Sequence, residues 1–540
     1  MKKKQIIAGL VFVAVIVLAA LLLWGRRAGD MADSQYQESK FGAFLAQQHA
    51  IYADDFDAAA RFSKDLVDVN SDLVQNDRAV SMFLAGKMDD SFAKLSSKTG
   101  TSAKAAYAAW RLSNDDWKAV RAIYKNSDSQ IMAGMRIWSA VATGNAKEAF
   151  AYVKKSGNSE SWQLFMNGMI YAETGNNKKA AENFDLVPIE FINLNDYLYM
   201  RAFYKKAGFL ESYEQLGLDF SVRPGGMFMT DREDDVEWSD FAGYKAALAF
   251  SLIQTVSHSP MLSGSTFSVL LLRTAEAVMP ADSAALRDAL NYYMGNAFFS
   301  TNRPRAEEFF AKIGQDSLFV PFAEFRMAES AGSDRAVLRA MNRIIDRNPL
   351  FLPAINKNFL IYMRQDRPGR AVRLISRVMD DESISAAGQA MFLNMRARAN
   401  LIRGKLNNAA DDIAKARDIS PDDPAIMATA VAVWVRQKKN LEEAYHTALM
   451  LIKNYPADLA SWDALGQVVN LREGVKEALE LYEKVGRVAE SNSALFVNLG
   501  DIRLAVGDKT GARAAFEKAL RLSGDGLSSP REIRRKLKRL

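Results

Sequence analysis

Apolar residues recur at three- and four-residue spacing along almost the whole chain from residue 40 onward. Glycine, asparagine and aspartate interrupt this pattern, and the alternation of polar and apolar positions that marks a strand is nearly missing. Such spacing places apolar side chains on one face of a helix, and the interrupting residues are typical of helix ends. The pattern predicts an all-α chain, a succession of amphipathic helices.

The N-terminal segment departs from this pattern. Residues 6–24 carry no charge, and a helix of that length spans close to a hydrocarbon core of about 30 Å. Lysines precede it, Arg26 and Arg27 follow it, and Trp24 stands where an aromatic belt residue would. A cleaved secretory signal is the alternative, but it favours a shorter apolar stretch and small residues at the cleavage site. We expect residues 1–27 to form an uncleaved signal anchor, a transmembrane helix.

The basic residues on either side of the apolar segment predict its orientation. Lys2, Lys3, Lys4 and the α-amino group outweigh the basic residues that follow the segment by a narrow margin. This predicts a single-pass protein of the inner (cytoplasmic) membrane whose body lies in the periplasm or outside the cell. A cytoplasmic body is the alternative. Residues 28–39 are polar, without an apolar period, and read as a tether.

The C-terminal part of the chain repeats itself. Shifted by 34 residues, positions of matching type coincide: Trp462 with Phe496, Leu465 with Leu499, Gly466 with Gly500, Ala478 with Ala512, and Tyr482 with Phe516. A fixed period of this length is the signature of a helical repeat array, in which each unit buries its apolar face against its neighbours.

These residues resemble the tetratricopeptide repeat (TPR), a 34-residue helix-turn-helix. The match is most complete over residues 390–526. The resemblance implies an α-solenoid of helix pairs, in which Gly466 and Gly500 stand where two helices cross closely and Tyr482 and Phe516 fill the space between them. It also implies a concave face lined by first-helix residues that binds a protein or peptide.

Residues 40–220 and 281–389 match the repeat less completely and are expected to be divergent units. Their matching positions are Gly168, Tyr171, Gly175, Ala180 and Phe184 in one unit, and Gly295, Phe298, Ala306 and Phe310 in another. Residues 221–280 hold no full repeat, although residues 241–255 and 268–279 read as helices. This segment is either an insertion or a hinge between two arms.

Composition excludes several classes of chemistry. The chain has no cysteine, so disulfides, thiolate metal sites and a cysteine nucleophile are all excluded. His49, His258 and His446 lie far apart, with no second type of metal ligand close by. A net charge of +6 over 540 residues is modest, and much of the excess lies at the termini. We therefore expect no metal, no cofactor and no nucleic-acid partner.

Two sequence features imitate functional motifs. Ser91 and Lys94, followed by residues 98–100, match two serine-lysine motifs of penicillin-binding proteins, but those motifs require a helix and a distant strand. The acidic residues of segment 231–237 lack the glycine and spacing of an EF-hand loop and read as a solvated loop. Phosphate-binding loops and hydrolase motifs are missing from the sequence as well. We expect no enzyme.

The C-terminal residues 527–540 predict a short basic helix. Ser529 is a suitable N-cap, with Pro530 at the first helical position and Glu532 at the third. Ile533 shares one face with two leucines, Leu537 and Leu540, which suits a helix that caps the last repeat. The remaining residues are basic and could attract anionic lipid or another acidic surface.

Aligning the clear repeats position by position gives the residues expected on the concave face. The candidate partner-binding groove consists of Asn394, Arg398, Arg436, Gln437, Asp463, Gln467, Asn470 and Asp501. We expect a membrane-anchored scaffold or adaptor for a protein or peptide partner, in envelope assembly, secretion or polysaccharide export. The alternative is a self-assembling structural protein of the envelope, which would form homo-oligomers.

Overall fold

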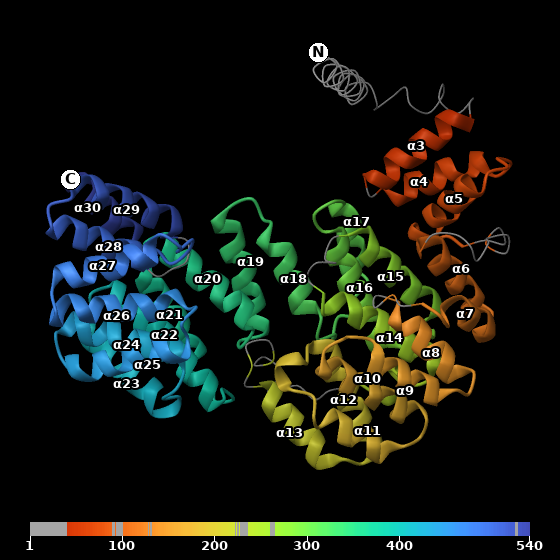
Figure 1. Ribbon diagram of the computed structural model, residues 1–540, viewed down its shortest axis with the longest axis horizontal. Coiled ribbons are helices and arrows are strands. Elements are labelled where there is room, and N and C mark those ends of the chain that lie inside the picture. The colour runs from red at the N-terminus through yellow and green to blue at the C-terminus, as the bar shows by residue number, and fades with distance from the viewer. Residues whose placement is uncertain are drawn as a thin grey trace. The chain divides into compact units, whose positions relative to one another are not determined.

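The computed structural model describes residues 40–53, 55–88, 92, 101–127, 129, 132–221, 223, 226, 236–259, 265–523 and 528–540 (Figure 1). The expected anchor and tether lie outside these residues, as do Ser91, Lys94 and the acidic run 231–235. Among the helices that are described, none is both long and apolar enough to cross a membrane.

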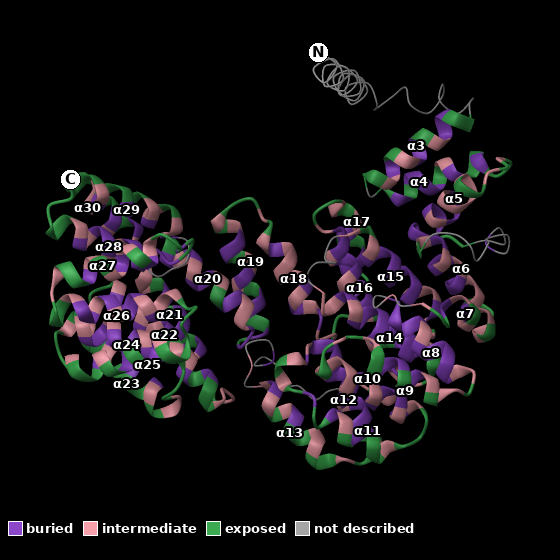
Figure 2. Cartoon of the chain, in the orientation of Figure 1, coloured by how far each residue is buried: buried purple, intermediate pink, exposed green. Residues whose placement is uncertain are grey.

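The described residues form 28 α-helices and a few 3₁₀ turns, with no strand among them. The all-α prediction is confirmed. Chain contacts divide the protein into two units: Met1–Val187 with Glu237–Ser317, and Pro188–Val236 with Leu318–Leu540. In both units, buried residues follow the helix faces that meet other helices (Figure 2).

The first unit contains α3 (Lys40–Tyr52), α4 (Phe56–Ser63), α5 (Asp72–Leu84), α6 (Thr101–Ser113), α7 (Trp117–Tyr124), α8 (Ala133–Ala142), α9 (Ala146–Lys155), α10 (Glu160–Glu173), α11 (Asn177–Phe184), α14 (Tyr244–Ser257), α15 (Thr266–Val278), α16 (Ala284–Phe298) and α17 (Arg303–Phe310). The second contains α12 (Leu194–Ala207), α13 (Leu210–Ser221), α18 (Val320–Glu329), α19 (Asp334–Arg347), α20 (Leu352–Arg364), α21 (Pro368–Val378), α22 (Ala386–Ile402), α23 (Leu406–Ile419), α24 (Pro424–Gln437), α25 (Leu441–Asn454), α26 (Leu459–Arg472), α27 (Val475–Gly486), α28 (Ser493–Ala505), α29 (Lys509–Leu522) and α30 (Pro530–Arg539).

The turns inside several repeats are built from glycine followed by a capping residue. Gly144 and Gly175 adopt φ values of +81° and +82°, which favour glycine because it lacks a Cβ. The next residues, Asn145 and Asn176, accept hydrogen bonds from backbone N–H groups in the first turns of α9 and α11. The residues that interrupt the apolar pattern therefore end one helix and begin the next.

The glycines predicted at helix crossings do lie there. A Cβ built on Gly466 would stand 2.4 Å from the Tyr482 ring, and one on Gly500 would stand 2.5 Å from the Phe516 ring. Two glycines of the first unit meet an aromatic ring in the same way. A Cβ on Gly168 would stand 2.5 Å from the Phe184 ring, and one on Gly295 would stand 2.3 Å from the Phe310 ring. This close approach confirms TPR-like helix pairs in both units.

The helices α14 and α15 fold back onto the N-terminal part of the first unit. α14 packs against α8, and α15 packs against α5 and α6. The indole N–H of Trp138 donates to the Ser251 hydroxyl at 2.7 Å, and Phe165 stacks on Phe250 with centroids 5.8 Å apart. Most residues of both helices are buried, which requires neighbours on several sides. The two helices expected within residues 221–280 are thus present and join the core of this unit.

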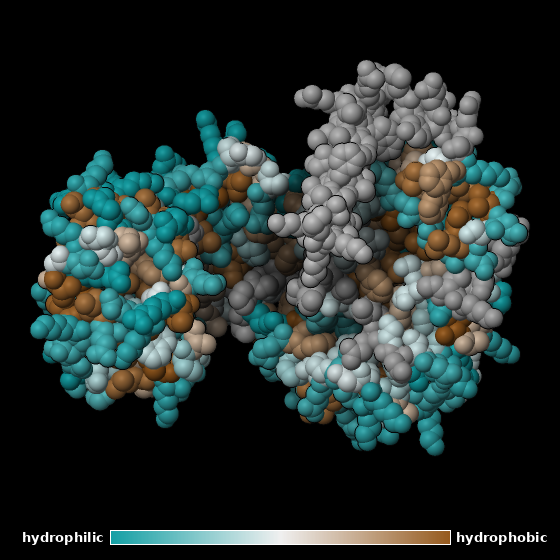
Figure 3. Space-filling view, turned by 45° about the horizontal axis from the view of Figure 1, so that its top comes forward, coloured by the Kyte–Doolittle hydropathy of each residue, from teal (hydrophilic) through white to brown (hydrophobic). Residues whose placement is uncertain are grey.

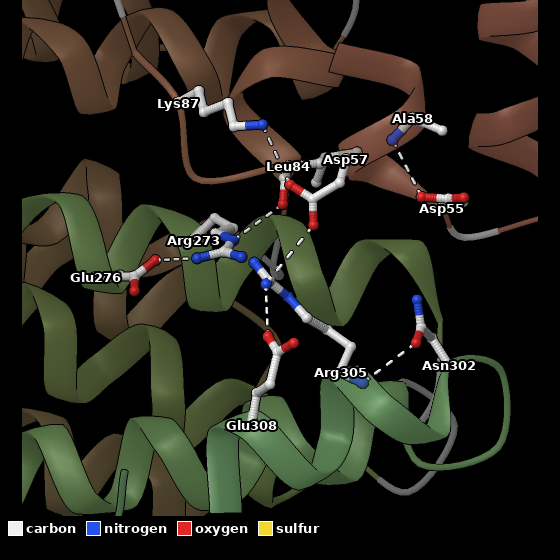
Figure 4. Close-up of polar contacts among 10 residues, drawn as sticks. All are labelled: Asp55, Asp57, Ala58, Leu84, Lys87, Arg273, Glu276, Asn302, Arg305 and Glu308. Carbon is white, nitrogen blue, oxygen red and sulfur yellow. Dashed lines mark hydrogen bonds and ion pairs between the residues drawn. The ribbon is translucent and has the colours of Figure 1, made fainter. Parts of the chain in front are cut away.

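A buried arginine strengthens this fold-back (Figure 4). The Arg273 guanidinium, in a side chain 5% exposed, donates to the carbonyl of Leu84 at 2.9 Å and pairs with Glu276. Leu84 ends α5, so a cation stands at the negative end of that helix. Nearby, Arg305 lies 3.6 Å from Asp57. These polar contacts connect α5 with α15 and α4 with α17.

Candidate partner-binding groove

The first helices of the C-terminal repeats line a common groove. α22, α24, α26 and α28 pack against one another in succession, each with its second helix beside it. Their shared face encloses a cavity of about 200 Å³ together with the start of α30. In Figure 3 most of the visible surface of this array, at the left, is hydrophilic, with small apolar patches between.

The groove has a floor of small residues. On α24, Ala425, Ala428, Thr429, Ala432 and Arg436 line the cavity, at the three- and four-residue spacing that keeps side chains on one helix face. Further alanines contribute to the lining from the neighbouring first helices: Ala460, Ala464 and Ala494. Side chains this short allow the backbone of a bound segment to approach the helices closely.

A buried carboxylate organises one wall of the groove. Asp463 of α26 accepts hydrogen bonds from the Tyr482 hydroxyl at 2.8 Å, from Asn498 at 2.8 Å and from Gln467 at 2.9 Å. Burial raises the pKa of the Asp463 carboxyl, although these donors and the charge of Arg436 lower it in part. Burial and the Asp463 charge hold the pKa of Tyr482 well above its usual value. The cluster fastens α26 to α27 and α28 and so fixes the shape of the wall.

Four of the eight predicted groove residues line the cavity. They are Arg398, Arg436, Asp463 and Gln467. Arg436 is exposed and forms no ion pair within 4 Å with a described residue. The structure thus brings together two guanidinium groups, one from α22 and one from α24, with an amide and a carboxylate from α26.

The other four predicted residues lie elsewhere. Asp501 forms an ion pair with Lys536 of α30, and Gln437 donates to the carbonyl of Leu406 at 3.4 Å. Asn394 and Asn470 each have a buried side-chain oxygen without a hydrogen-bond partner among the described residues. By the repeat period Asn394 corresponds to Asp463 and Asn470 to Arg436, which do line the cavity. The cavity ends before it reaches the corresponding positions in the repeats of Asn394 and Asn470.

Two parts of the groove were not predicted from the sequence. Asn498 follows Asp463 by 35 residues, so the repeat period could have identified it. The second part is the C-terminal segment, from which Ser528, Ser529, Glu532 and Ile533 line the cavity. No local pattern indicates that contact. Across the described part of the chain, no group of three or more histidine, aspartate or glutamate side chains is placed to hold a metal ion.

Compared with family models and with curated proteins, the sequence gives no match. Among solved structures, the chain is similar to one titled "Crystal structure of APC/C hetero-tetramer Cut9-Hcn1". The identity is 14%, the match covers 93% of this chain and 85% of that chain, and the TM-score is 0.32. The repeat assignment therefore rests on the glycine and aromatic contacts within this chain. By those contacts the described residues form an all-helical, TPR-like repeat protein.

Proposed function

We propose that the protein is an interaction scaffold whose C-terminal array holds an extended segment of a partner protein in the groove. The observation that supports this is the cavity of about 200 Å³ on the common face of four first helices, with an alanine floor and a polar rim. Such a surface suits hydrogen bonding to a peptide backbone, while the short floor residues leave room for side chains of the partner.

The polar residues at the edge of the groove, Arg436, Gln467 and Asn498, favour a partner that offers hydrogen-bond acceptors near Arg436. Asn498 and Gln467 already donate to Asp463, so their amide N–H groups are partly used within the wall. The Arg436 guanidinium is exposed at the same cavity and has five N–H donors. A carboxylate or backbone carbonyl of the partner would satisfy these donors.

Photo-crosslinking in cells tests the groove directly. A benzoylphenylalanine residue in place of Ala432, which lines the cavity, is expected to capture a partner protein. Introducing Arg436→Glu is expected to reduce that product at least about tenfold. The variant loses a charge-assisted hydrogen bond to the partner and adds repulsion between its carboxylate and the partner's acceptor, and together these cost more than about 1.4 kcal/mol of binding free energy. The reporter position for comparison is Lys453, which is exposed on α25 and does not line the cavity.

The controls separate specific capture from background. Lys453→Glu makes the same charge reversal outside the groove and is expected to leave the Ala432 product unchanged. Identical products from the reporters at Ala432 and Lys453, or a product at Ala432 that is insensitive to Arg436→Glu, would contradict partner binding in the groove.

The scaffold is further proposed to be anchored in the inner membrane through residues 6–24, with the array outside the cytoplasm. Support comes from the uncharged run and its basic flanks. The partner would then belong to the envelope assembly or export machinery. Alkaline phosphatase fused after Leu540 is expected to be active in a bacterial host. An inactive phosphatase together with a fluorescent cytoplasmic reporter at the same site would reverse the orientation.

A further inference from the structure

The C-terminal segment 528–540 forms part of the groove it follows. Ser528, Ser529, Glu532 and Ile533 line the same cavity as Arg436. Ser529 accepts a hydrogen bond from the backbone N–H of Glu532 and so begins α30, as its sequence predicts. The N-terminal end of α30 therefore stands beside the residues to which a partner would bind.

Two of the contacts that hold this segment join residues that are one repeat length apart in sequence. The Ser528 hydroxyl lies 2.5 Å from the Ser493 hydroxyl, and the Lys536 ammonium lies 2.6 Å from the Asp501 carboxylate. Each pair is separated by 35 residues in sequence. By these contacts α30 occupies the place of a further first helix beside α28, and Lys536 engages one of the predicted groove residues.

The third contact joins the segment to a much earlier repeat. The Ser529 hydroxyl donates to the Asp366 carboxylate at 2.6 Å, across 163 residues of sequence. Asp366 lies in the turn between α20 and α21, outside the four repeats whose first helices form the groove. The segment thus contacts both the last repeat of the groove, at α28, and the turn between α20 and α21, which lies before the first repeat of the groove.

Few side chains secure the segment. Ile533 is 1% exposed and packs into the core of the last repeats, with Leu537 and Leu540 partly buried beside it. The other basic residues of α30 are exposed: Arg531, Arg534, Arg535, Lys538 and Arg539. Attachment depends on two buried side chains, Pro530 and Ile533, on the buried hydrogen bond between Ser528 and Ser493, and on two partly buried polar contacts. Because this is few contacts compared with the core of the repeats, α30 can be released without unfolding them.

We propose that the segment Ser528–Leu540 is a latch that closes the groove, and that a partner enters when the Ser529–Asp366 and Lys536–Asp501 contacts open. The proposal rests on the function proposed for the groove. In the closed state, Ser529, Glu532 and Ile533 narrow the entrance and Asp501 is paired with Lys536. In the open state, the cavity becomes accessible and Asp501 is free to contact the partner.

Thiol labelling measures the opening in the full-length chain without any partner. Because the chain contains no cysteine, a single introduced cysteine gives an unambiguous signal. Val497 of α28 lines the cavity, so Val497→Cys reports on the groove. Its reaction with uncharged 4,4′-dithiodipyridine is expected to be at least tenfold slower than that of Lys453→Cys, which is exposed on α25.

Two substitutions open the latch without disturbing the cap of α30. Asp366→Gly removes the acceptor for Ser529 and suits the backbone φ of +57° at that position. Lys536→Met removes the charge that pairs with Asp501 and keeps an apolar stem near the Phe516 ring. Combined, they are expected to raise the Val497→Cys rate at least tenfold. Ala448→Cys, at a fully buried position of α25, is expected to stay protected.

Each other outcome would overturn the latch. A Val497→Cys rate equal to that of Lys453→Cys in the closed protein would mean that the groove is already open. An unchanged rate in the double variant would mean that these contacts do not control access, and an equal rise at Ala448→Cys would mean that the whole array has loosened. None of these results affects the crosslinking test of the groove, so the two proposals fail separately.

Discussion

Replacing Gly466 by alanine is expected to destabilise the C-terminal array by about 1–3 kcal/mol, although alanine is the better helix former. The added Cβ would stand 2.4 Å from a carbon of the Tyr482 ring. That ring is 1% exposed, and its hydroxyl donates to Asp463 at 2.8 Å, so it cannot withdraw without breaking the Asp463 cluster. Hydrogen exchange of the backbone amides in α26–α28 measures the effect locally, since about 1.4 kcal/mol corresponds to tenfold faster exchange.

Gly369→Ala is the matched control. Gly369 lies in the first turn of α21, where the nearest atom to an added Cβ is Nε of Arg403 at 3.8 Å. This substitution is expected to be neutral or to stabilise by up to about 1 kcal/mol. A second comparison places Gly466→Ala in a Tyr482→Leu background, where the clash is absent and the cost should fall. Equal effects of alanine at Gly466 and Gly369 would contradict the close crossing.

Replacing Arg273 by methionine is expected to destabilise the first unit by about 2–4 kcal/mol. The change leaves the Leu84 carbonyl, in a buried position, without its side-chain donor, and it leaves the partly exposed Glu276 without its partner. The expected cost is below that of a fully buried ion pair because the Glu276 side chain is 35% exposed. Faster amide exchange in α5 and α15 is the measurement, because both helices lose the connection that Arg273 makes.

Arg287→Met provides the control for this prediction. Arg287 also donates to backbone carbonyls, those of Pro280 at 3.1 Å and Ala281 at 3.3 Å, but the contacts are exposed to solvent. Its replacement is expected to change stability by less than about 0.5 kcal/mol. If Arg273→Met costs no more than Arg287→Met, α15 is held to the N-terminal helices by apolar packing alone.

Much of the repeat architecture could be predicted because its determinants are local. The turn glycines and the capping asparagines act on neighbouring residues, and Gly466 meets Tyr482 only 16 residues away within one helix pair. The same residue types recur every 34 residues because each unit repeats one packing arrangement. Four of the eight groove candidates line one cavity for the same reason, since equal positions on successive first helices share a face.

The amino-acid sequence by itself therefore determined the helices, their pairing and the common face of the C-terminal repeats, because these depend on contacts within one or two repeat lengths. Only the tertiary structure decided which distant segments meet. The return of α14 onto α8 joins Ser251 to Trp138, and the placement of the C-terminal segment joins Ser529 to Asp366. Such contacts depend on how successive repeats stack, because the small rotation between neighbouring repeats adds up over many units. The residues that come into contact therefore follow no sequence period.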